Sequence, residues 1–185
     1  QACMLLLHRD TEYYPTLHTI LVYPHPFYSH VKQYLEGGIV AEGEQGRLGE
    51  SWLRGPVILS WDDVRRSAHD HNDGHNVVFH EFAHQLDSES GTTDGAPLLP
   101  ERSMYIAWAR VLSTEYQDLL DHLEHNHKSD IDFYGATNPA EFFAVITEYF
   151  FEKPVQLQKK HPELYEQLKS FYKLDTEAIM LKNNK

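Results

Sequence analysis

HNVVFHEFAHQLD, residues 75–87, is the stretch of this chain that most strongly constrains its fold and its chemistry. Its apolar residues recur near the helical period, so it predicts a helix of about three to four turns. A helix turns by about 100° per residue, and His80 and His84 therefore lie one turn apart on the same side. Both imidazoles can reach a single metal ion, and Glu81 lies beside them.

The H-E-x-x-H spacing is typical of hydrolases that bind Zn²⁺ through two neutral imidazoles. Zinc lowers the pKa of a water molecule from 15.7 to about 7, and the adjacent carboxylate acts as general base. The alternative is an ordinary helix, because the chain is rich in histidine, with 13 such residues. The apolar residues on both sides of the motif favour the metal site, since they can give it dry surroundings.

A catalytic zinc normally has three protein ligands and one open position, so a third ligand is needed. Asp87 follows on the same helix, and we expect it to orient a histidine or to support the structure rather than to bind the metal. His122, His125 and His127 also have some metal-like spacing. Their polar and charged neighbours favour a solvated helix end instead.

Two further carboxylates, Glu141 and Glu148, lie seven residues apart and so on nearly the same face of a helix predicted over residues 139–153. This helix is apolar almost all round and should be buried, where a carboxylate needs a partner. Glu141 is either the third ligand or, three residues after Asn138, a partner of the backbone at the helix cap. Glu148 is either the ligand or the acceptor for a ligand imidazole N–H. Spacing does not separate these roles.

The rest of the chain predicts an α+β fold with a small mixed or antiparallel sheet and a helical C-terminal half that carries the metal site. Residues 19–27 and 55–61 are rich in β-branched and aromatic residues and are bounded by turn residues, so we expect two strands. The second is either a central strand or an edge strand along which a peptide substrate could lie extended. The glycine-rich segment between the two suits a loop or a hairpin. Further helices are expected over residues 101–126 and 154–173.

Composition narrows the classes of partner. The formal net charge is −12, from 28 acidic and 16 basic residues, which argues against nucleic acid and anionic membranes as partners. Cys3 is the only cysteine, so an internal disulfide is excluded and a cytoplasmic location is expected. The length fits a single catalytic domain over residues 1–175 with a frayed tail over 176–185. Because the chain opens on Gln1, we expect a further segment before it.

Four stretches together resemble the Mlc titration factor A family of bacterial zinc metallopeptidases: GPVILSWDDV, GHNVVFHEFAHQLD, FYGATNPAEFFAVITEYFF and HPELYEQLKSFY. The resemblance extends from about Cys3 to Tyr172, and its most specific marks are the H-E-F-A-H-x-L-D and P-A-E-x-F-A-V blocks. It implies a zincin-like catalytic core of the gluzincin type that hydrolyses peptide bonds. It also implies that Glu141 is the third zinc ligand and that Tyr134, seven residues earlier, lies near the metal.

The predicted mechanism follows from this set. Zn²⁺ is bound by His80, His84 and Glu141, Glu81 is the general base, and Tyr134 donates a hydrogen bond to the oxyanion. A peptide or protein is then the substrate. The family's namesake members are also associated with binding a sugar-responsive transcriptional repressor, so the alternative is a regulator-binding protein with a structural or vestigial zinc site. Hydrolysis of a non-peptide amide would use the same site.

Overall fold

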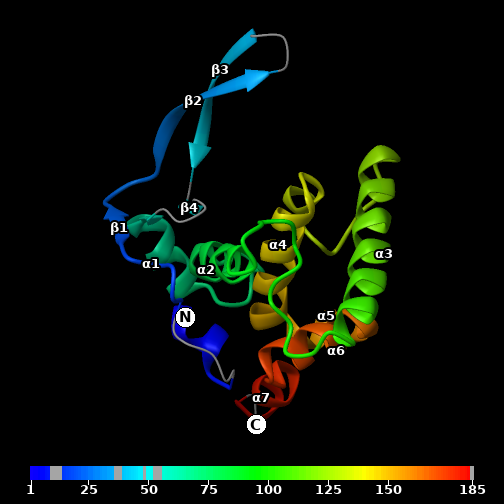
Figure 1. Ribbon diagram of the computed structural model, residues 1–185. Helices are drawn as coiled ribbons and strands as arrows, with labels where there is room; N and C mark the ends of the chain where they lie inside the picture. The colour runs from blue at the N-terminus through cyan, green and yellow to red at the C-terminus, as the bar shows by residue number, and fades with distance from the viewer. Residues whose placement is uncertain (9–13, 36–38, 48, 52–55, 184–185) are drawn as a thin grey trace.

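A computed structural model describes residues 1–8, 14–35, 39–47, 49–51 and 56–183. Helices predominate, and a small sheet lies at one side of them (Figure 1). This arrangement confirms the α+β prediction. The elements in chain order are η1 (Ala2–Leu6), β1 (Ile20–Tyr23), β2 (Phe27–Leu35), β3 (Ile39–Arg47), β4 (Gly49–Ser51), β5 (Val57–Ser60), α1 (Trp61–His69), α2 (Val77–Ser88), α3 (Met104–Glu124), η2 (Phe133–Ala136), α4 (Pro139–Glu152), α5 (Pro154–Lys160), α6 (Pro162–Tyr172) and α7 (Thr176–Asn183).

The sheet has three strands in the order β1-β5-β4, with β1 parallel and β4 antiparallel to β5. Strands predicted over residues 19–27 and 55–61 are therefore present as β1 and β5. Of the two alternatives left open for the second strand, the structure shows the central one, because β5 is paired with β1 on one side and with β4 on the other. This excludes β5 as an edge strand along which a substrate could lie. Between β1 and β4 the chain forms the antiparallel hairpin β2–β3, which projects away from the helices (Figure 1).

Helices α2 and α4 pack against each other at the centre of the molecule (Figure 1). Asn76 caps α2, since its side-chain oxygen accepts hydrogen bonds from the backbone N–H groups of Val78 and Phe79, both at 3.1 Å. Asn138 caps α4 in the same way, accepting from the N–H of Glu141 at 2.9 Å, and Pro139 takes the first helical position. Most of α4 is buried, as its apolar sequence predicts.

The helices differ from the sequence-based expectations at three places. Residues 154–173 form two helices, α5 and α6, because Pro162 forces His161 out of the helical region, to φ −130° and ψ 59°. Helix α1 was not predicted, although Ser60 accepts from the N–H of Asp63 and two aspartates occupy its first turn. Residues Thr176–Asn183, which the sequence assigns to a frayed tail, lie in α7.

The core is built around α4 and is strongly aromatic. Phe143 and Phe150 are fully buried, and the Trp108, Phe171 and Tyr172 rings pack on them from α3 and α6. This packing fixes the axial position of α4, and thereby the height at which its carboxylates face α2. Of the helices in the described part of the chain, none is both long enough and apolar enough to cross a membrane.

Candidate metal centre

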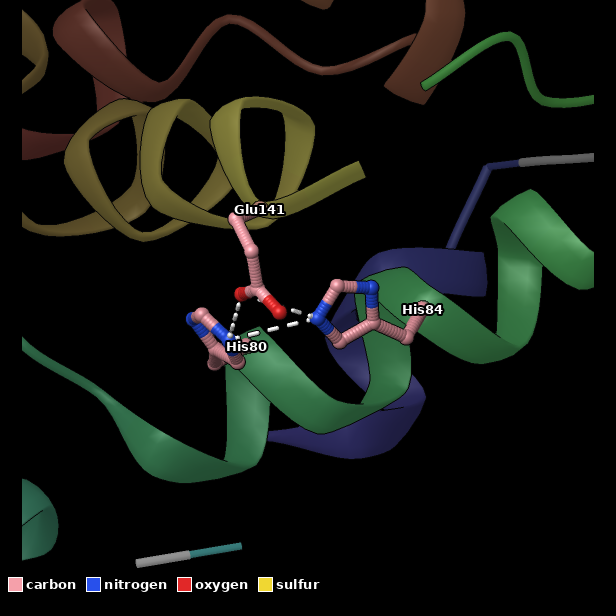
Figure 2. A group of neighbouring side chains, drawn as sticks. All are labelled: His80, His84 and Glu141. Carbon is pink, nitrogen blue, oxygen red and sulfur yellow. Dashed lines mark hydrogen bonds and ion pairs between the residues drawn. The ribbon is translucent and has the colours of Figure 1, made fainter. Parts of the chain in front are cut away.

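His80 and His84 from α2 and Glu141 from the first turn of α4 point toward one another (Figure 2). One ligand atom of each residue lies within 4.8 Å of the other two, and such a group can hold a metal ion. Within the described residues, this is the only cluster of three or more His, Cys, Asp or Glu side chains with that property. The structure thus brings together the two histidines of the motif and one of the two candidate glutamates.

The three ligand atoms are closely spaced. Nε2 of His80 is 3.0 Å from Oε2 of Glu141, and Nε2 of His84 is 3.3 Å from the same oxygen. The two Nε2 atoms are 3.3 Å apart. The His80, His84 and Glu141 side chains keep 14, 11 and 19% of their surface exposed, so solvent or a ligand can reach the centre from one side.

Glu148 fixes the orientation of the His80 ring. Its Oε1 lies 2.7 Å from Nδ1 of His80, and its Oε2 accepts a hydrogen bond from the backbone N–H of Asn76. A carboxylate in this position accepts the Nδ1 proton, which leaves Nε2 as the ring nitrogen that faces the cluster. Glu148 thus lies behind His80, whereas Glu141 lies in front of it.

The electrostatics of the cluster favour a positive charge between its members. Burial opposes a charge on His80, but hydrogen bonds to Glu141 and Glu148 outweigh it and raise the His80 pKa to about 10. Burial likewise opposes a charge on Glu141, yet hydrogen bonds to His80 and His84 lower its pKa to about 2. Burial, supported by the charge on His80, lowers the pKa of His84. Without a metal, a proton on His80 therefore supplies the positive charge that the carboxylates attract.

Glu81 is buried, with 4% of its surface exposed, and precedes His84 by less than one turn of α2. Its charge contributes to the raised pKa of His80, which places its carboxylate within electrostatic reach of the cluster. Nδ1 of His84 is buried and has no hydrogen-bond partner among the described residues. A neutral His84 with its proton on Nδ1 would present a lone pair at Nε2, the atom that faces the cluster.

Tyr134 lies in η2, directly before α4, and its ring centroid is 5.7 Å from that of His80. It is 55% exposed, so its ring borders the open side of the cluster. Asp132 holds this turn in place, accepting from the Tyr134 backbone N–H at 2.7 Å.

The other candidate residues are elsewhere. Asp87 is not part of the cluster, and its Oδ2 accepts a hydrogen bond from the N–H of Gly95 at 2.8 Å, which ties the loop after α2 to the helix. At the end of α3, the ring of His127 stacks on that of His125, with a centroid separation of 5.8 Å, and packs edge-to-face against that of His122 at 5.9 Å. They do not join the cluster.

Asn76 and Glu152, which were not predicted from the sequence, support the cluster from behind. Besides capping α2, Asn76 donates its side-chain N–H to Oε1 of Glu152 at 2.8 Å, while Oε2 of Glu152 accepts from the N–H of Gly74 at 3.0 Å. Burial, with a contribution from the charge on Asp73, raises the pKa of Glu152 to about 7. The cap position of Asn76 could have been read from the sequence, whereas its bond to Glu152, 76 residues away, could not.

A family of glucose-regulated metallo-peptidases, M90, matches residues 1–173 of this chain. The chain belongs to the M90 family. Among the relatives of this M90 protein, an uncharacterized protein of Synechocystis sp. is 48% identical over 95% of the chain and 64% of its own length. Proteins named Mlc titration factor A are 34% identical in Escherichia fergusonii, over 94% of the chain and 65% of the relative, and 37% identical in Serratia proteamaculans, over 84% and 60%. The M90 chain thus spans a little under two thirds of the length of these curated relatives.

Proposed function

We propose that this chain is a zinc-dependent metallopeptidase with a zincin-like core of the gluzincin type. The observation that carries the proposal is the convergence of His80, His84 and Glu141 from two helices on one point. Membership of a metallo-peptidase family supports the same reading. The three side chains would bind the metal and leave a coordination position open, as catalytic rather than structural zinc sites do.

The donor set suits zinc in chemistry and in size. Zn²⁺ in proteins binds imidazole nitrogen and carboxylate oxygen at about 2.0–2.2 Å, usually in a tetrahedron. Donor atoms at the corners of such a tetrahedron are about 3.3–3.6 Å apart. The separations of 3.0, 3.3 and 3.3 Å between the three ligand atoms lie close to this value. Little rearrangement is therefore needed to admit the ion.

When bound, zinc would polarise the scissile carbonyl and lower the pKa of a water molecule. Glu81 would accept the proton of the attacking water and return it to the leaving amine, a role that suits a carboxylate shielded from bulk solvent. Tyr134 would donate a hydrogen bond to the carbonyl oxygen as negative charge develops on it. Glu148 would keep His80 in the tautomer that binds through Nε2.

The Glu81→Gln and His84→Ala variants separate these roles. Glu81→Gln should retain zinc while peptide hydrolysis falls by about 10²–10⁴-fold, because only the base is lost. His84→Ala should lose both zinc and activity. Zinc content is measured by atomic emission. Hydrolysis is measured with a library of fluorescence-quenched peptides. Glu166→Gln, an exposed carboxylate on α6, is the matched control and should change neither. Full activity of zinc-loaded Glu81→Gln would refute the assignment of the base.

A second function, binding of a transcriptional regulator, is supported by the name of the relatives, Mlc titration factor A. If this function is separate from hydrolysis, Glu81→Gln should bind Mlc as tightly as the wild type does. Equal loss of binding and of hydrolysis in this variant would show that both depend on the same group. The comparison is made by surface plasmon resonance with immobilised Mlc.

A further inference from the structure

A cavity of about 280 Å³ lies along α4 on the side of the metal centre. Residues 73–75, just before α2, form one wall, and residues 129–133, just before η2, form another. Val145 and Tyr149 of α4 line the third side, with Lys153 at its end. Residues 73–75 and 129–133 lead into α2 and η2, which carry His80 and Tyr134, and the third wall belongs to the helix that carries Glu141.

The cavity begins about one helical turn from the cluster. Val145 and Tyr149 follow Glu141 by four and eight residues on α4, which places them about 6 and 12 Å along the axis and turns them about 40° and 80° round the helix from Glu141. Asp132, in the opposite wall, is the residue that holds Tyr134 against His80. A peptide with its scissile bond at the cluster would therefore have a neighbouring side chain within reach of the cavity.

The hydroxyl of Tyr149 is a buried polar group without a partner. Tyr149 is 3% exposed, and its hydroxyl oxygen has no hydrogen bond among the described residues. Burial, with a smaller contribution from the charge on Asp130, raises its pKa to about 12, so the hydroxyl stays uncharged at neutral pH. Asp130 also lines the cavity, which indicates that the hydroxyl is directed to this side of α4. A buried hydroxyl of this kind needs a hydrogen-bond partner, and a ligand in the cavity can supply it.

Carboxylates dominate the charged lining. Asp73, Asp130 and Asp132 line the cavity, whereas Lys153 is the one lysine or arginine that the described residues contribute to it. Lys160, which does not line the cavity, forms an ion pair with Asp130, with its Nζ 2.5 Å from Oδ2, and neutralises this carboxylate. The Nζ atom of Lys153 lies over the ring of Tyr149, 5.9 Å from the centroid. The remaining negative charge favours a cationic ligand over a neutral or anionic one.

We propose that this cavity binds the side chain of a lysine or arginine next to the scissile bond of a peptide substrate. The proposal rests on the peptidase function proposed above. A terminal ammonium group fits less well, because the nitrogen of a terminal residue at the scissile bond lies within about 3.8 Å of that bond. It could not reach Tyr149, whereas the long stem of a basic side chain can extend along the wall formed by Val145.

The proposal is tested by binding to the zinc-loaded Glu81→Gln variant, which should not turn peptides over. The probes are pentapeptides, acetylated and amidated at their ends, that carry one arginine, citrulline or glutamate in an alanine background at each position in turn. Citrulline keeps the shape of arginine without its charge. At one position of the pentapeptide, we expect the arginine peptide to bind about tenfold more tightly than the citrulline peptide. A factor of this size is what a hydrogen bond to a charged group contributes. The glutamate peptide should bind most weakly.

Three further substitutions in the Glu81→Gln background assign this preference to the cavity. Tyr149→Phe removes only the hydroxyl, and Asp73→Asn removes a charge but keeps an oxygen for the N–H of His75. Each should reduce the preference for arginine to about threefold or less. Lys153→Met keeps an apolar stem over Tyr149 but removes a competing positive charge, and should increase the preference. Asp118→Asn, an exposed carboxylate on α3, should leave it unchanged.

Tyr149→Phe should unfold at the same temperature as its parent, because its hydroxyl has no partner to lose. The proposal is overturned if arginine and citrulline peptides bind equally at every position, or if neither Tyr149→Phe nor Asp73→Asn changes the preference. Failure of the peptidase function itself is distinguishable. In that case the zinc-loaded wild type would cleave none of the peptides although the binding preference persisted.

Discussion

Replacement of Gly95 by alanine should destabilise the protein and weaken the metal centre, although Gly95 touches none of its ligands. Gly95 has φ +78°, and its N–H and C=O groups are bonded to Asp87 and to the indole N–H of Trp108. A Cβ atom at this position would lie 2.5 Å from the carbonyl oxygen of Pro139 and 2.9 Å from its carbon. Pro139 begins α4, two residues before Glu141, so any relief of this overlap displaces the turn that carries the carboxylate.

The expected magnitude has two parts. An alanine at positive φ costs about 1–2 kcal/mol, and overlap with backbone atoms that cannot rotate away adds about 1–3 kcal/mol. Gly95→Ala should therefore lower the free energy of unfolding by about 2–5 kcal/mol. Gly91→Ala provides the matched control, since Gly91 has φ +93° but a Cβ atom there would meet nothing within 4 Å. Gly91→Ala should therefore be destabilised only by the cost of an alanine at positive φ.

The assays are guanidinium denaturation of the metal-free proteins and zinc titration against a chromophoric chelator. Gly95→Ala should unfold at lower denaturant than Gly91→Ala and bind zinc about tenfold or more weakly, because misplaced ligands bind poorly. Gly91→Ala should keep the zinc affinity of the wild type. Equal stability and equal zinc affinity of the two variants would refute the coupling of this loop to the start of α4.

Three other results are expected. The Glu148→Gln side chain has one oxygen and cannot accept hydrogen bonds from both the His80 ring and the Asn76 backbone, so zinc affinity in the chelator assay should fall by about 10–100-fold. An unchanged zinc affinity would exclude a role of Glu148 in orienting His80. Burial raises the pKa of Asp87 from 3.8 to about 6, so this group's stabilising effect is lost as the pH rises through that window. The free energy of unfolding of Asp87→Asn should thus be higher than that of the wild type by up to about 3 kcal/mol at pH 7, but not below pH 4. A difference that does not change with pH would contradict this. Because the His80 pKa is about 10 and a zinc-bound water has a pKa of about 7, zinc binding at pH 8 should release about two protons, one from each group. Calorimetry in two buffers measures this number, and release of only about one proton would mean that His80 is already neutral.

Features set by short-range patterns were predictable. The helical period around His80 and His84 and the Asn138-Pro139 start of α4 are local signals, and α2 and α4 begin within two residues of the expected positions. Pro162 is a local signal of the same kind, so the break between α5 and α6 is also predictable from the sequence. The Ser60 cap of α1 belongs to the same class.

The amino-acid sequence is sufficient to place two imidazoles on one helix face and two carboxylates on another, because both facts follow from the period of a single helix. It left open which carboxylate meets the imidazoles. Only the packing of α2 against α4 decided that Glu141 faces Nε2 of His80 and Glu148 faces Nδ1 of the same ring. The cavity at Tyr149 could not be predicted either, since one of its walls, residues 73–75, comes from a segment more than 50 residues before the other two, and only the folded core brings them together.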